Sequence, residues 1–154
     1  MIAAQLITQW LDGQLSTIRP ANGYFYEAQV LHNYADAPQN MPAPPAAILI
    51  AEATAETVKD TAAGLTPRRV KLSREVFING LVTVPPGTRP NDALDALAFD
   101  VRRALYPAAK SLTATAQIKQ FNEGECRFIF PDKGSTTAKL LMRFNFEFIE
   151  NYEV

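Results

Sequence analysis

Helix-like spacing of apolar residues occurs in two segments of the chain. In residues 2–12 apolar side chains recur every three or four positions, which gives one face suited to packing on a sheet or on a neighbouring subunit; Gly13 is the expected end. Residues 90–106 form the clearer helix, with acidic residues near its start, basic residues near its end, and Pro107 as its expected end. Its apolar face comprises Leu94, Leu97, Ala98, Val101 and Leu105. The spacing therefore predicts two helices.

The segment between these helices begins with strand-like patterns. Residues 23–31 alternate in the manner of a strand, whereas residues 37–45 contain four prolines in nine positions and are expected to form a stiff, extended connector. Residues 46–51 form a continuous apolar run, which is typical of a strand buried on both faces. Residues 52–67 are rich in Ala and Thr and lack an apolar stripe, so we expect a long loop there, either projecting toward a partner or simply flexible.

Residues 69–84 alternate over an unusual length for one strand. Asn79-Gly80 is a sequence typical of a tight hairpin turn, which would divide the segment into two strands. The phase of the alternation nevertheless continues across this pair, which favours one long, bent strand with a bulge at Gly80.

The last third of the chain is predicted to be β-structure. Residues 113–121 are expected to pair with residues 125–130 through a turn at Asn122-Glu123-Gly124, and Pro131-Asp132-Lys133-Gly134 predicts a second turn. The stretch from Met142 to Phe148 alternates most sharply, which requires one buried and one polar face.

Together these elements predict one α+β domain over residues 1–154. The expected sheet is mixed and mostly antiparallel, with two helices packed on one face, one long strand and one long loop. A length of 154 residues is enough for one core.

The charge and the reactive residues narrow the class of protein. A net charge of −1 disfavours broad nucleic-acid binding, one Cys excludes an intrachain disulfide, and one Cys with one His cannot form the usual kind of zinc site. No apolar run approaches the ~20 residues that span a bilayer, and the first residues lack a basic, uninterrupted signal sequence. We therefore expect synthesis and folding in the cytoplasm, with no membrane partner, no cofactor and no metal.

Candidate chemistry is sparse. His32 and Cys126 are the only residues that could form a nucleophile–base pair of the Cys/His kind, but a free Cys is common in cores and a lone His is common in loops. We therefore expect no catalytic residues. A short basic stretch, Arg68, Arg69, Lys71 and Arg74, is the candidate assembly surface, because charges along a strand commonly set the register between partners.

Several strings resemble the tail terminator family of long-tailed bacteriophages, the minor tail protein U type. Pro44-Pro45-Ala46-Ala47-Ile48-Leu49-Ile50 looks like its buried strand, and Val70 to Val84 like its long strand. The strings Asp92-Ala93-Leu94-Asp95-Ala96-Leu97 and Arg103-Ala104-Leu105-Tyr106-Pro107 resemble the helix that follows and its ending. The last residues, Phe148 to Val154, resemble the closing strand of that family. The likeness covers most of the chain in order, and least of residues 13–43 and 52–67.

The resemblance implies a structural virion protein rather than an enzyme. Such a protein assembles in the bacterial host cytoplasm as a ring, expected to be a homohexamer, and then resides in the virion tail. The ring caps the tail tube, ends the polymerisation of tube subunits and offers a surface to the head–neck connector protein. Sequence-specific nucleic-acid binding is not implied.

Two other functions remain open at this stage. Another head–tail connector or neck protein would share the structural class but occupy a different position in the virion. The other is a small ligand-binding or Cys/His enzyme domain that uses the Tyr/Phe-rich sheet. As an enzyme it would require His32 and Cys126 to converge.

Overall fold

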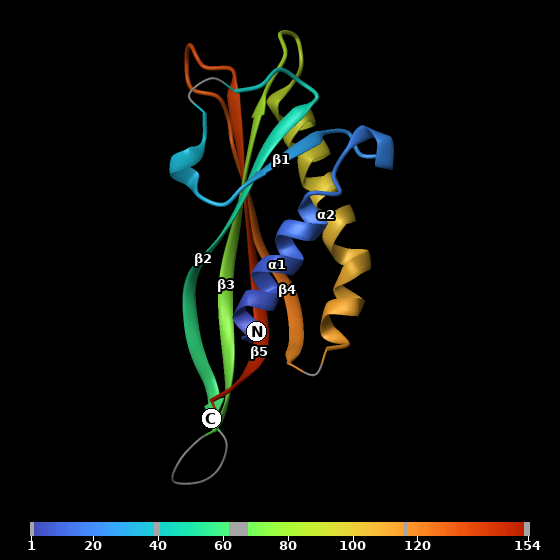
Figure 1. Ribbon diagram of the computed structural model, residues 1–154. Helices are drawn as coiled ribbons and strands as arrows, with labels where there is room; N and C mark the ends of the chain where they lie inside the picture. The colour runs from blue at the N-terminus through green and yellow to red at the C-terminus, as the bar shows by residue number, and fades with distance from the viewer. Residues whose placement is uncertain (1, 39–40, 62–67, 116, 153–154) are drawn as a thin grey trace.

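The computed structural model describes residues 2–38, 41–61, 68–115 and 117–152. These residues form an α+β fold in which two α-helices pack against a five-stranded mixed sheet (Figure 1), which confirms the predicted fold class. The helices are α1 (Ala3–Leu15) and α2 (Pro90–Thr113), and two short 3₁₀ helices occupy Pro20–Asn22 and Tyr34–Asp36. The strands are β1 (Glu27–Leu31), β2 (Ala46–Thr61), β3 (Arg69–Thr83), β4 (Ile118–Ile129) and β5 (Thr137–Asn151).

The strands lie in the order β1-β2-β3-β5-β4. Only β1 and β2 run parallel, and all other neighbours are antiparallel. The two central strands, β3 and β5, pair from Arg69 opposite Asn151 to Thr83 opposite Thr137 without a break in register. The ladders of β2 on β3 and of β4 on β5 each contain two register shifts. The sheet therefore has a regular central ladder with an irregular ladder on each side of it, while the short ladder of β1 on β2 has no register shift.

The segment with Asn79-Gly80 is one strand, so the long-strand alternative is confirmed and the hairpin is excluded. The expected bulge at Gly80 is wrong, because Gly80 lies opposite Leu49 on one side and Leu140 on the other with no shift in either register. Gly80 instead lets helix α2 pack closely on the sheet. A Cβ atom at position 80 would lie only 2.7 Å from Cδ2 of Leu97, a buried residue of α2.

The predicted loop over residues 52–67 is wrong for residues 52–61, which continue β2 to Thr61; residues 62–67 lie outside the described residues. This half of β2 pairs with β3 as far as Thr61 opposite Val70. We call these two paired segments the ribbon; they extend toward one end of the molecule, with β5 on the other side of β3 (Figure 1). Residues 53–59 are exposed. An apolar stripe is missing because this strand owes its conformation to hydrogen bonds with β3 rather than to burial.

Both predicted helix ends are wrong for the same physical reason. α1 continues through Gly13 to Leu15, and α2 continues through Pro107 to Thr113. Glycine and proline cost a helix interior about 1 and about 3 kcal/mol relative to alanine. Each helix nevertheless regains apolar burial beyond the unfavourable residue, because Leu15 is fully buried and Leu112 is buried.

Two strand boundaries also differ from the prediction. β1 begins only at Glu27, because the backbone N–H groups of Phe25 and Tyr26 donate to a carboxylate on α2 instead of to a neighbouring strand.

The expected turn at residues 122–124 is wrong: β4 is one strand, and a register shift against β5 falls between Glu123 and Cys126. The turn at residues 131–134 is confirmed by the positive φ of Gly134.

The main core lies between the helices and one face of the sheet. Its largest fully buried side chains include Ile7 and Leu11 of α1, Leu94 of α2, and Phe144, Phe146 and Phe148 of β5. A small second cluster of Ile48, Ile50 and Leu81 lies on the opposite face, with Ala37 and Met41 of the proline-rich segment packed against it. The strand over residues 46–51 is thus covered on both faces along most of its length, as predicted.

Replacing Gly80 tests the close approach of α2 to β3. We expect Gly80→Ala to lower the free energy of unfolding by about 1–3 kcal/mol, because the new methyl group must displace packed side chains. Chemical denaturation measures this loss. Gly13→Ala is the matched control, since no atom lies within 4 Å of its Cβ position, and there we expect a gain of up to about 1 kcal/mol. Equal stability of Gly80→Ala and the wild type would contradict the packing argument.

Candidate functional site

The β2–β3 ribbon is the most prominent candidate for an assembly surface. β1 covers the outer edge of β2 only from Ala46 to Ile50, so within the described chain the edge from Ala51 onward has no strand beside it. On the opposite side of the sheet, β4 likewise has no outer neighbour among the described residues. The molecule therefore presents two different strand edges on opposite sides.

The predicted basic stretch lies on this ribbon but not on one face. Lys71 lies 3.5 Å from Glu147 across the face of the sheet that the helices leave uncovered. Arg74 points to the helix side, where its guanidinium is 2.8 Å from Glu56 and 5.7 Å from the ring centre of Phe148. These two cations therefore lie on opposite faces, where Lys71 links β3 to β5 and Arg74 links β3 to β2.

The other two basic residues, Arg68 and Arg69, lie at the start of β3. Arg69 is exposed and begins the strand opposite Asn151. The carbonyl of Arg68 accepts a 2.6 Å hydrogen bond from the backbone N–H of Tyr152. Alternation along β3 places Arg69 on the side of Lys71, so this pair, but not Arg74, shares a face.

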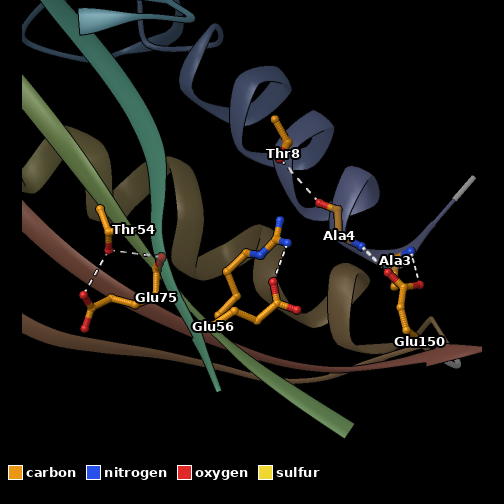
Figure 2. Close-up of polar contacts among 8 residues, drawn as sticks. Ala3, Ala4, Thr8, Thr54, Glu56, Glu75 and Glu150 are labelled. Carbon is orange, nitrogen blue, oxygen red and sulfur yellow. Dashed lines mark hydrogen bonds and ion pairs between the residues drawn. The ribbon is translucent and has the colours of Figure 1, made fainter. Parts of the chain in front are cut away.

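The uncovered face of the sheet carries paired charges. Besides Lys71 and Glu147, Arg143 lies 3.9 Å from Glu75 and Arg127 lies 2.9 Å from Glu125. The hydroxyl of Thr54 donates to Glu75 at 3.0 Å (Figure 2). A shallow cavity of about 100 Å³ lies among Phe77, Leu141 and the Glu125–Arg127 pair. This face is thus polar and internally neutralised, with a small apolar centre.

His32 and Cys126 do not come together. His32 follows β1 at one edge of the sheet and its Nδ1 lies 3.3 Å from Asp12, whereas Cys126 is half-buried on β4 at the opposite edge. Burial is the main cause that raises the pKa of the Cys126 thiol, which disfavours the thiolate. The arrangement that a Cys/His enzyme would require is therefore absent.

A polar cluster beside Cys126 joins α2 to β4. Arg102 donates three hydrogen bonds of 2.8, 2.9 and 3.3 Å to Glu123, and the hydroxyl of Tyr106 donates to the same carboxylate at 2.9 Å. The hydrogen bond from Arg102 lowers the pKa of Glu123, while burial, with the bond to Glu123, raises the pKa of Tyr106 to about 12. Every member has a partner, so the cluster fastens the helix to the edge strand.

Two buried carboxylates were not identified from the sequence. Glu150 of β5 accepts hydrogen bonds from the backbone N–H groups of Ala3 at 2.7 Å and Ala4 at 3.3 Å (Figure 2), and so caps the start of α1. Asp100 of α2 is fully buried and accepts from the N–H groups of Phe25 and Tyr26 at 3.1 and 2.8 Å. Their signal in the sequence is an acid on an apolar face, since Glu150 continues the alternation of β5 and Asp100 is spaced with Ala93, Leu97 and Ala104.

Neither a metal centre nor a membrane span emerges from the described residues. Among them, no group of three or more His, Cys, Asp or Glu side chains is placed to hold a metal ion. No described helix is long and apolar enough to cross a bilayer.

Comparison of the chain with known protein families and with curated proteins found no match.

Exchanging Glu150 tests the cap of α1. In Glu150→Gln an amide NH2 group replaces one carboxylate oxygen, and this group cannot accept a hydrogen bond from a backbone N–H. We therefore expect a loss of about 1–2 kcal/mol in the free energy of unfolding. Urea denaturation provides the measurement. Glu147→Gln is the control, because its partner Lys71 is 42% exposed, and there the change should stay within about 0.5 kcal/mol. Equal losses in the two variants would refute the cap.

The pH dependence of stability tests Asp100. Burial is the largest cause acting on this carboxyl and raises its pKa, although the two N–H donors and Arg103 oppose the shift. A folded-state pKa above the unfolded value means that the protonated form favours folding, and this contribution is lost as pH rises through the folded pKa. We therefore expect the wild type to gain stability relative to Asp100→Asn as pH falls from neutral toward about 4. Denaturation of both proteins over that range measures the difference; a constant difference would contradict the assignment.

Proposed function

We propose that the protein is a bacteriophage tail terminator, which caps the tail tube, ends tube polymerisation and offers the surface to which the head joins. The observation that carries the proposal is the agreement in the order of elements. The sequence strings that resemble the tail terminator family imply a buried strand, a long strand directly before the second helix, and a closing strand at the end of the chain. β2, β3, α2 and β5 occupy these positions.

A ring of identical subunits requires two different surfaces on each subunit, because each copy contacts its neighbours head to tail. The outer edge of β2 beyond Ala51 and the outer edge of β4 are two such surfaces, on opposite sides of one sheet. They support assembly as a ring, with a homohexamer as the proposed stoichiometry.

The ribbon is the part of this assembly surface that we propose to contact a neighbour. Its exposed strand covers residues 53–59. Arg68 and Arg69 lie beyond that strand, at the start of β3, next to the pair of Val70 with Thr61. The ion pair of Arg74 with Glu56 joins the two strands of the ribbon, which reduces the entropy lost on binding. The further proposed partners are tail tube subunits on one side of the ring and the head–neck connector protein on the other, in the assembled virion.

Deletion of the gene in the encoding phage tests the proposal. Without a terminator, tube growth has no stop, so we expect electron microscopy to show tails of uncontrolled length, and a plasmid copy of the gene to restore the normal length. Tails of normal length that lack heads would contradict the proposal and favour the alternative of a head–tail connector or neck protein.

A ribbon variant sharpens the test. Thr57 is exposed on β2 opposite Ser73, and a lysine at an exposed strand edge discourages pairing with another chain. We expect Thr57→Lys to fail in restoring tail length while the protein still folds. Thr88→Lys, in the exposed loop before α2, is the matched control and should restore it. Full rescue by Thr57→Lys would remove the ribbon from the assembly surface.

A further inference from the structure

Two exposed phenylalanines lie side by side on the helix-covered side of the molecule. Phe25, just before β1, is 61% exposed, and Phe99 of α2 is 54% exposed. Their ring centres are 5.9 Å apart in an edge-to-face arrangement. Single exposed apolar residues are ordinary, but two aromatic rings that pack on each other in solvent form a patch of the kind that binds partners.

The backbone beneath this patch is held in place. The N–H groups of Phe25 and Tyr26 donate to buried Asp100, and the hydroxyl of Tyr26 donates to the carbonyl of Ala93 at 3.1 Å. The ring of Tyr24, the residue before Phe25, has its centre 5.0 Å from the guanidinium of Arg103. The aromatic pair is therefore pre-organised, which lowers the entropic cost of binding.

The charges around the patch are arranged with opposite signs at its two ends. Asp95 lies four residues before Phe99 and Arg103 lies four residues after it, and both are exposed. One α-helical turn is 3.6 residues, so both charges lie on the same side of α2 as Phe99, each about 6 Å along the axis. Asp92, one turn before Asp95, extends the acidic end.

This arrangement is complementary to itself. If a second α2 is laid antiparallel on the first with a two-fold axis beside Phe99, Asp95 of each copy faces Arg103 of the other. The same rotation brings the two Phe25–Phe99 pairs together, and the two helix dipoles oppose each other favourably. A parallel arrangement would instead place like charges together.

We propose that this face of α2 binds a second copy of the chain in an antiparallel, two-fold dimer. Phe25 and Phe99 form its apolar centre, and Asp95 with Arg103 form its two symmetric ion pairs. Since two aromatic pairs bury an area at the small end of specific interfaces, the dimer is weak and depends on concentration. The contact uses neither sheet edge, so it is independent of the proposed ring.

Sedimentation velocity across a concentration series, at low ionic strength, tests the proposal. We expect a monomer–dimer equilibrium in the wild type, and a dissociation constant raised about tenfold or more by Phe99→Ser or by Asp95→Arg. Asp132→Arg, at the turn between β4 and β5, makes the same charge change away from the patch and should leave the equilibrium unchanged. Thermal unfolding checks that each variant folds.

Cross-linking separates this dimer from any other assembly. In a Cys126→Ser background, Phe99→Cys places the new thiols of the two copies beside the two-fold axis, so mild oxidation should give a disulfide between the two positions 99. Lys133→Cys in the same background is the control and should give none. A protein that stays monomeric at every concentration, a dimer unaffected by Asp95→Arg, or a dimer without the 99–99 disulfide would overturn the proposal.

Discussion

The unbroken antiparallel ladder between β3 and β5 is the constraint on which the rest of the fold depends. Because side chains alternate along a strand, this register places Val76 opposite Phe144 and Leu72 opposite Phe148 on one face, and charged residues on the other. A slip by one residue would expose the phenylalanines and bury Lys71 and Glu147. Helix α2 can pack closely only where the side chains on this face are small, which is why a glycine, Gly80, lies beneath Leu97.

The helices are then fixed by polar contacts that apolar packing alone does not specify. Glu150 holds the start of α1, Asp100 of α2 holds the segment before β1, and Glu123 of β4 holds α2 through Arg102. Apolar contacts are non-directional, whereas each of these carboxylates needs its donors at one place. The three acids thereby determine where each helix lies along the sheet.

The strongest patterns in the sequence were sufficient for the class of fold. The alternation from Met142 to Phe148 predicted β5, and the spacing of Leu94, Leu97 and Val101 predicted α2. Local signals failed where distant contacts outweighed them: Pro107 did not end α2, and residues 52–61 form a strand that only β3 explains. The candidate site shows the same limit, because Arg74 and Lys71 could be assigned to opposite faces by alternation, but their partners Glu56 and Glu147 depend on the register of other strands.

Irregular edges suit a protein proposed to end a polymer. Long, regular strand edges pair with further chains without limit, and a head-to-tail contact that does not close produces a filament. Here the register shifts fall in the ladders on either side of the central one, at Ala53–Ala55 and Val58–Asp60 in β2 and at Ile118–Gln120 and Glu123–Cys126 in β4, while the central ladder has none. Such shifts twist a strand and make its edge a poor template for indefinite pairing. A subunit with these edges favours contacts of one defined geometry, which is the condition for a ring that closes.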